Sequence, residues 1–156
     1  MKISVIHMGE TAGSYLKGGL AMYEGRIRHY VPFELIYLPE PKLKSRSEKL
    51  QKENEGKTIL SSLSNCDHRI LLDERGRQLS SPAFAAYLQQ VMNRGVKNLG
   101  FVIGGPFGFS EEVYAKVPEM ISLSAMTFSH QMVRLLFLEQ IYRAFTIIRG
   151  EPYHHG

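Results

Sequence analysis

Compact apolar runs recur along the chain, and each is typical of a buried β-strand. The predicted strands cover residues 3–8, 33–38, 69–72, 99–103 and 121–123. Between them, apolar residues recur at spacings of three and four, which indicates amphipathic helices. The predicted helices lie within residues 11–30, 42–64, 82–94 and 131–149, and a short helix follows Ser110. Strands that alternate with helices predict an α/β domain with a mainly parallel sheet flanked by helices.

Turn and cap residues mark several of the predicted boundaries. Pro32 ends the first helix, and residues 73–76 form a turn after the third strand. Ser80 or Ser81 can cap the helix that follows, because a serine side chain accepts a hydrogen bond from the first free backbone N–H groups. Ser129 can cap the last helix in the same way.

The last predicted helix, residues 131–149, is apolar on nearly every side. Such a helix must be buried on several sides, and in a domain this small a subunit interface is the natural way to bury it. We therefore expect a homodimer. Among the charged residues of this helix, Glu139 and Arg143 can pair at i, i+4. Arg134 can face a phosphate or form a salt bridge on the surface or at an interface.

A length of 156 residues is typical of one domain. Because 44% of the residues are hydrophobic, the domain can bury a sizeable core. The formal net charge of +4 suits a polyanionic partner without proving one. Residues 1–100 hold the basic surplus, with 15 basic and 10 acidic side chains. Within them lies one basic cluster, diluted by three glutamates, whose members are Lys42, Lys44, Arg46, Lys49, Lys52 and Lys57. Such a cluster is usually a solvated helix face, but it can also meet phosphates.

A single cysteine, Cys66, excludes a disulfide framework and a cysteine-rich zinc site. A lone thiol fits a reducing compartment. No apolar run approaches the roughly 20 residues that a membrane span needs. We therefore expect a cytoplasmic protein without a membrane partner. No metal site is expected, because His154 and His155 lack the clustered partners that a metal requires.

Three segments follow the ends of predicted strands, where parallel α/β sheets bind their ligands. The first is Leu72 with Asp73, and the second is the glycine loop 104–108, whose backbone can approach a ligand closely. A tight strand-to-helix turn explains the glycines equally well. The third is Ser122–His130, which offers polar edges and apolar walls. An ordinary connection, with His130 on the surface, is the alternative for this segment.

Residues along nearly the whole chain resemble one known family. The most specific segments are FVIGGPFGFS at 101–110 and SLSAMTFSHQMVRLLFLEQIYRAFTIIRGEPYHHG at 122–156. MKISVIHMG, PFELIYLPEPK and ILLDERGR extend the match toward the N-terminus. The chain thereby resembles the RlmH family of SPOUT-class methyltransferases, which act on large-subunit ribosomal RNA.

The resemblance implies a single SPOUT-type α/β domain over residues 1–156. A C-terminal trefoil knot and the cofactor site would lie mainly in residues 100–156. It also implies a homodimer, S-adenosylmethionine as cofactor, and methylation of N3 of a pseudouridine in 23S ribosomal RNA, on the large subunit or the assembled ribosome. The implied cofactor-binding residues, together with the neighbouring glycine of the loop, are Leu72, Gly104, Gly105, Leu123, Ser124, Ala125, Met126, Thr127 and Phe128.

Methylation of an imide nitrogen requires that its proton be removed or shared during attack. His130, Tyr153 and His154 are the candidate catalytic groups, because histidine is the usual base near neutral pH and a phenol can bind or stack on the base. We expect the tail of one subunit to close over a pocket, in its own chain or its partner's. The candidate RNA contacts are Lys42, Lys44, Arg46, Lys49 and Arg134.

Three alternatives remain open at this point. The strand and helix pattern alone favours a flavodoxin-like or other nucleotide-binding domain. A SPOUT enzyme that methylates another base or a ribose hydroxyl would share most of the motifs. A non-catalytic ribosome-binding or assembly protein could keep the fold, although it would have no need of the glycine loop and the SLSAMTF segment.

Overall fold

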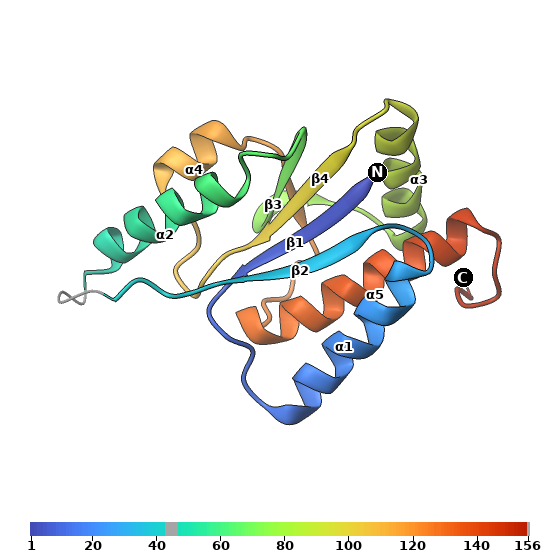
Figure 1. The fold of residues 1–156 in the computed structure, drawn as a ribbon, viewed down its shortest axis with the longest axis horizontal. Helices are drawn as coiled ribbons and strands as arrows, with labels where there is room; N and C mark the ends of the chain where they lie inside the picture. Colours follow the sequence, from blue (N-terminus) through green and yellow to red (C-terminus); the bar gives the residue numbers. More distant parts are fainter. Residues whose placement is uncertain (43–46, 156) are drawn as a thin grey trace.

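Five parallel strands form one sheet in the order β2-β1-β4-β3-β5 in the computed structural model, which describes residues 1–42 and 47–155 (Figure 1). The strands are β1 (Lys2–Met8), β2 (Phe33–Leu38), β3 (His68–Gln78), β4 (Asn98–Ile103) and β5 (Met120–Ser122). The helices are α1 (Ser14–Arg28), α2 (Glu48–Ser62), α3 (Ser81–Asn93), α4 (Glu111–Lys116) and α5 (His130–Ile148). The predicted α/β class and parallel sheet are confirmed.

Helices cover both faces of this sheet. One core contains apolar residues of α1, α3 and α5 together with the strand residues that point to that face, such as Ile3, Phe101 and Ile103. A smaller core on the other face joins α2 and α4 to Ile6 and Val102. Figure 1 shows α1 and α5 side by side, across the sheet from α2 and α4. Strands buried on both faces explain why they appear in the sequence as continuous apolar runs.

Serine side chains begin four of the helices. Ser47, Ser80, Ser110 and Ser129 each accept a hydrogen bond from the backbone N–H three residues later. These bonds satisfy donors that the helices cannot satisfy internally. The caps predicted at Ser80 and Ser129 are therefore confirmed. The cap at Ser129 fixes where α5 begins after β5.

The third strand differs from its prediction, because it continues past the expected turn to Gln78. Leu72 and Arg77 both pair with Ile121 of β5, so residues 73–76 form a bulge within the strand. At Gly76 a Cβ atom would lie 2.6 Å from the Ile121 backbone nitrogen. Close approach of the two backbones explains the glycine, and the bulge directs Asp73 and Arg75 out of the sheet.

Among the described helices, none is long and apolar enough to cross a membrane.

His7 of β1 lies in the sheet with 3% of its surface exposed, and its Nδ1 is 3.0 Å from the carbonyl oxygen of Gly9. Burial, and then the charge of Arg134, lower the pKa of His7 from 6.5 to about 4. His7 therefore binds a proton below pH 6.5 in the unfolded chain, whereas in the folded chain it stays neutral until the pH falls to about 4.

We expect the free energy of unfolding to fall as the pH drops from 6.5 to 4, by up to about 3 kcal/mol from His7 alone. Above pH 6.5 this contribution is complete. Urea denaturation at several pH values measures it, and His7→Gln should flatten the curve over this interval because glutamine does not titrate. Parallel curves for the two proteins would contradict the assignment to His7.

Candidate functional site

A cleft of about 780 Å³ opens at the carboxyl ends of β3, β4 and β5, which are adjacent in the sheet. Its walls come from the three segments picked out in the sequence: the end of β3 with its bulge, the glycine loop, and the segment after β5. Of the predicted cofactor residues, those that line it are Leu72, Gly104, Gly105, Leu123, Ser124, Met126, Thr127 and Phe128. Ala125 is exposed and does not line the cleft.

The glycine loop packs against buried side chains behind the cleft. A Cβ atom on Gly104 would lie 3.0 Å from Cζ of Phe109, and one on Gly105 would lie 3.3 Å from a carboxyl oxygen of Glu55. Phe109 and Glu55 are both buried. The two glycines therefore let the loop backbone lie flat against the interior and leave the cleft side open for a ligand.

Internal hydrogen bonds shape the segment after β5. The Ser122 hydroxyl donates to the carbonyl oxygen of Ser124 at 3.0 Å, and the backbone N–H of Met126 donates to the Ser124 hydroxyl at 2.9 Å. This turn leaves the side chains of Met126 and Phe128 exposed, by 76% and 43% respectively. Large apolar side chains that edge a cleft are suited to holding a flat or thioether-like ligand.

The pKa values of two carboxyl groups beside the cleft shift in opposite directions. Burial alone would raise the pKa of Asp73, but hydrogen bonds from Tyr114 and Arg75 outweigh it and hold the pKa below its usual value. Burial raises the pKa of Glu55, and the hydrogen bond from Gln51 offsets this only in part. Asp73 is therefore an ionised carboxylate, paired with Arg75, in a cleft that Glu48, Glu74 and Glu111 also line. It was identified in the sequence only as a strand end, whereas Tyr114 and Glu55 carry no sequence signal that marks them.

His130, the first residue of α5, lines the cleft as predicted for a catalytic group. Burial and the nearby charge of Arg134 lower its pKa, and Glu40 opposes them weakly. Its imidazole is therefore neutral at pH 7 and able to accept a proton. His130 is also a half-buried residue in the first turn of α5, behind the Ser129 cap, so its catalytic role stays a prediction.

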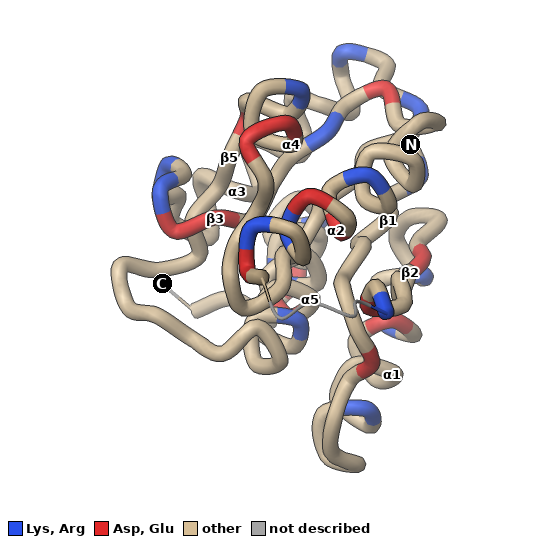
Figure 2. The backbone as a smooth tube through the Cα atoms, turned by 90° about the vertical axis from the view of Figure 1, so that its left-hand side faces the viewer, with Lys and Arg blue, Asp and Glu red and all other residues tan. Residues whose placement is uncertain are grey.

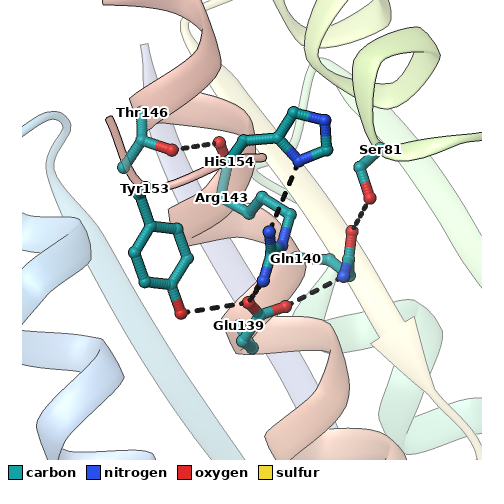
Figure 3. Close-up of polar contacts among 7 residues, drawn as sticks. All are labelled: Ser81, Glu139, Gln140, Arg143, Thr146, Tyr153 and His154. Carbon is teal, nitrogen blue, oxygen red and sulfur yellow. Dashed lines mark hydrogen bonds and ion pairs between the residues drawn. The ribbon is translucent and has the colours of Figure 1, made fainter. Parts of the chain in front are cut away.

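The other two predicted catalytic residues lie on the tail, which folds back against the middle of α5 (Figure 3). The Tyr153 hydroxyl donates to Oε1 of Glu139 at 3.1 Å, and Nη1 of Arg143 lies 3.4 Å from Nδ1 of His154. Glu151 accepts a hydrogen bond from the Tyr30 hydroxyl at 2.5 Å and so anchors the tail to the end of α1.

Within one chain, Tyr153 and His154 therefore do not lie beside His130. Glu139 is nine residues beyond His130, a separation of roughly 14 Å along the helix axis. Burial, with hydrogen bonding to Tyr23 and Glu139, raises the pKa of Tyr153, so its phenol remains a hydrogen-bond donor at neutral pH. Nε2 of His154 is buried and has no hydrogen-bond partner among the described residues.

Arg134 was predicted to contact RNA phosphate, and this prediction is wrong. Its side chain is 1% exposed, and its Nη2 donates to the carbonyl oxygen of Met8 at 2.6 Å. Nη1 donates to the Thr11 hydroxyl at 3.0 Å, and the neighbouring Gln131 accepts from the backbone N–H of Ala12. Arg134 thus fastens the start of α5 to the loop between β1 and α1.

Replacing Arg134 by Met should lower the free energy of unfolding by roughly 3 kcal/mol, because the buried carbonyl of Met8 loses its donor. Urea denaturation checks this. The control is Arg149→Met at the exposed end of α5, which should change stability by less than about 0.5 kcal/mol. Equal stability of the two variants would show that Arg134 does not fasten the helix.

The structure describes only part of the predicted basic cluster. Lys42 and Lys49 are exposed, whereas Lys44 and Arg46 lie outside the described residues. Glu48 and Lys52, on the first turns of α2, line the cleft itself. Basic and acidic segments alternate along α2 in Figure 2, so this helix carries both signs of charge.

Comparison with known proteins agrees with this fold and cleft. The family model described as a predicted SPOUT methyltransferase matches residues 1–154. A probable methylase family protein from Haemophilus influenzae superposes with a TM-score of 0.55 at 16% identity, over 95% of this chain and 66% of that one. TrmJ from Z. mobilis superposes with a TM-score of 0.53 at 12% identity, over 97% and 72%.

The fold and the cleft define a protein of the SPOUT methyltransferase class. Ribosomal RNA large subunit methyltransferase H of Christiangramia forsetii is 52% identical over 156 residues, and that of Flavobacterium johnsoniae is 53% identical, each match covering 99% of both chains. This chain belongs to the ribosomal RNA large subunit methyltransferase H family.

Proposed function

We propose that the protein uses S-adenosylmethionine to methylate N3 of a pseudouridine in 23S ribosomal RNA, within the large subunit or the assembled ribosome in the cytoplasm. The observation that carries this proposal is the cleft at the ends of β3, β4 and β5, in a chain of this family. Its walls contain every residue that the family resemblance gave for the cofactor except Ala125.

The residues of the cleft fit this cofactor. Gly104 and Gly105 leave room for an adenosine against the loop backbone, and Met126 and Phe128 offer apolar contacts to it. When bound, the cofactor supplies a methyl group on a sulfonium, and holding the acceptor nitrogen in line with it accounts for much of the rate.

His130 is the group we assign to the N3 proton. It lines the cleft and is neutral at pH 7, as a general base must be. Tyr153 is assigned to binding the base through its hydroxyl or its ring, since a phenol with a raised pKa is a poor base at neutral pH. His154 remains a second candidate for the proton.

The working unit we propose is a homodimer with a knotted C-terminal region. An interface between two chains would bury apolar area on α5 and on the segment before it. The residues are the half-buried Met132, Val133 and Leu136 and the exposed Met126 and Phe128. Two α5 helices packed antiparallel about a two-fold axis would bring the end of each helix to the start of the other. The partner's tail would then reach His130, which the tail of the same chain does not.

The lysines of the basic cluster are assigned to RNA phosphates. Lys42 and Lys49 are exposed, and Lys44 and Arg46 belong to the same cluster in the sequence. Arg134 is excluded from this set because it is buried. A ribosomal substrate contacted through its phosphates should bind with an affinity that falls steeply with salt.

Titration calorimetry with S-adenosylmethionine, in the absence of RNA, separates this function from its main rival. A methyltransferase should bind the cofactor with one site per chain, whereas a ribosome-assembly protein that kept only the fold should show no heat of binding. Transfer of a labelled methyl group to ribosomes then separates N3 of pseudouridine from other bases and from ribose hydroxyls.

A further inference from the structure

The side chain of Tyr114, from the short helix α4, joins two walls of the cleft that are far apart in the sequence. Its hydroxyl donates a hydrogen bond to Oδ2 of Asp73, on the bulge of β3, at 2.5 Å. The same oxygen accepts from the backbone N–H of Phe109, where the glycine loop ends, at 3.4 Å. One phenol oxygen therefore connects the loop after β4 to the bulge of β3.

Contacts around Tyr114 hold this bridge in one geometry. Oδ1 of Asp73 accepts from both the backbone N–H and Nε of Arg75, at 2.9 and 3.2 Å. The Arg75 guanidinium lies over the Tyr114 ring, 4.3 Å from its centroid, and the Phe109 ring meets the Tyr114 ring edge-on. The Asp73 side chain is 8% exposed, so its hydrogen bonds are shielded from water.

The glycine loop has one backbone hydrogen bond of its own, from the Gly108 N–H to the carbonyl oxygen of Gly105 at 3.2 Å, and the bridge ties this turn to β3. Residues 104–108 include three glycines, and Gly108 has a positive φ of 76°. A glycine-rich loop loses more conformational entropy than other loops when it is ordered. A hydrogen bond to an ionised carboxylate is about twice as strong as one between neutral groups. The bridge orders the loop before a ligand arrives, and preorganisation of this kind raises affinity.

We propose that Tyr114 is a positioning residue for the cofactor: by bonding Asp73 and the Phe109 N–H together, its hydroxyl sets the spacing of the two loops that hold S-adenosylmethionine. This inference rests on the proposed function, since it takes the cleft to be the cofactor site. It assigns to α4, which contains no predicted site residue, a role in binding.

Tyr114→Phe removes the hydroxyl and keeps the ring. We expect the dissociation constant for S-adenosylmethionine, measured by calorimetry without RNA, to rise about tenfold. The KM for the cofactor should rise similarly, with kcat at saturation changed less than about twofold, because the bridge acts on binding and not on the methyl group. The Phe109 amide should exchange its hydrogen faster in the ligand-free variant.

Tyr87→Phe is the matched control outside the cleft. The Tyr87 hydroxyl also donates to a carboxylate, Oε1 of Glu119 at 2.6 Å, and Arg77 lies over the Tyr87 ring at 5.0 Å. This variant loses an equivalent hydrogen bond, so its thermal stability should fall by a similar amount while cofactor affinity stays within about twofold. Equal weakening of cofactor binding in both variants would reduce the role of Tyr114 to general stability.

A double-mutant cycle with Asp73→Ala, which removes the acceptor, tests the bridge itself. If Tyr114 acts through Asp73, the double variant should bind the cofactor no more weakly than Asp73→Ala alone. Additive losses would overturn the bridge. Cofactor affinity of Tyr114→Phe equal to wild type would refute this inference alone, whereas no cofactor binding by the wild-type protein would refute the proposed function and this inference with it.

Discussion

Deletion of residues 153–156 is expected to abolish methyl transfer to ribosomal RNA, while the affinity for S-adenosylmethionine stays within about twofold of wild type. Tyr153, His154 and His155, the described residues of the deleted segment, do not line the cleft, so binding of the cofactor should survive their loss. Transfer should not, because Tyr153 and His154 are assigned to the RNA base. Calorimetry and a methyl-transfer assay on the same preparation measure the two effects, and normal turnover by the truncated protein would refute the assignment.

The contacts of the tail make a sharper experiment possible. Within one chain, Tyr153 bonds Glu139 in the middle of α5, and His130 lies roughly 14 Å away along the helix. If each site is completed by the partner's tail, a tail-deleted protomer and a protomer with a blocked cleft should complement each other. Random reassociation makes half of the dimers mixed, each with one complete site, so about a quarter of wild-type activity should return. No recovery would place the tail over its own cleft.

Gly104→Val is expected to displace the glycine loop and to weaken S-adenosylmethionine binding by about 10- to 100-fold, since overpacking against a buried side chain costs roughly 1–3 kcal/mol. A Cβ atom at this position would lie 3.0 Å from the buried Phe109 ring, so the loop must move. Calorimetry measures the loss, and the same variant supplies the blocked protomer for complementation.

The control for this substitution is Gly25→Val on α1. A Cβ atom on Gly25 would have nothing within 4 Å outside its own helix, so the added side chain should leave cofactor binding unchanged. Circular dichroism should find both variants folded. Wild-type affinity in Gly104→Val would contradict the placement of the cofactor against the glycine loop.

Local patterns were enough to predict most of the fold. β2 occupies residues 33–38 as its apolar run and flanking prolines predicted, and the serine caps placed the starts of α3 and α5. Because parallel strands present their carboxyl ends at one edge, the segments after β3, β4 and β5 could be grouped as one site before any coordinates were known. The adjacency of these three strands then brought the segments together.

Long-range contacts decided what the patterns could not predict. The bulge of β3 exists because Leu72 and Arg77 share one partner on β5, a pairing that no local signal encodes. The burial of Arg134 could not be predicted, because it depends on a hydrogen bond to the carbonyl oxygen of Met8 on β1, 126 positions away. The Tyr114 bridge likewise joins residues 41 positions apart.

Mass mapping of 23S ribosomal RNA tests the proposed function most directly. Ribosomes from cells that lack the protein would be incubated with it and with S-adenosylmethionine, and each RNA fragment would be compared before and after. We predict one added methyl group, on N3 of a pseudouridine, that does not appear with Gly104→Val or with the tail-deleted protein. A methyl group on a ribose or another base, or no methyl group at all, would contradict the function proposed for this chain.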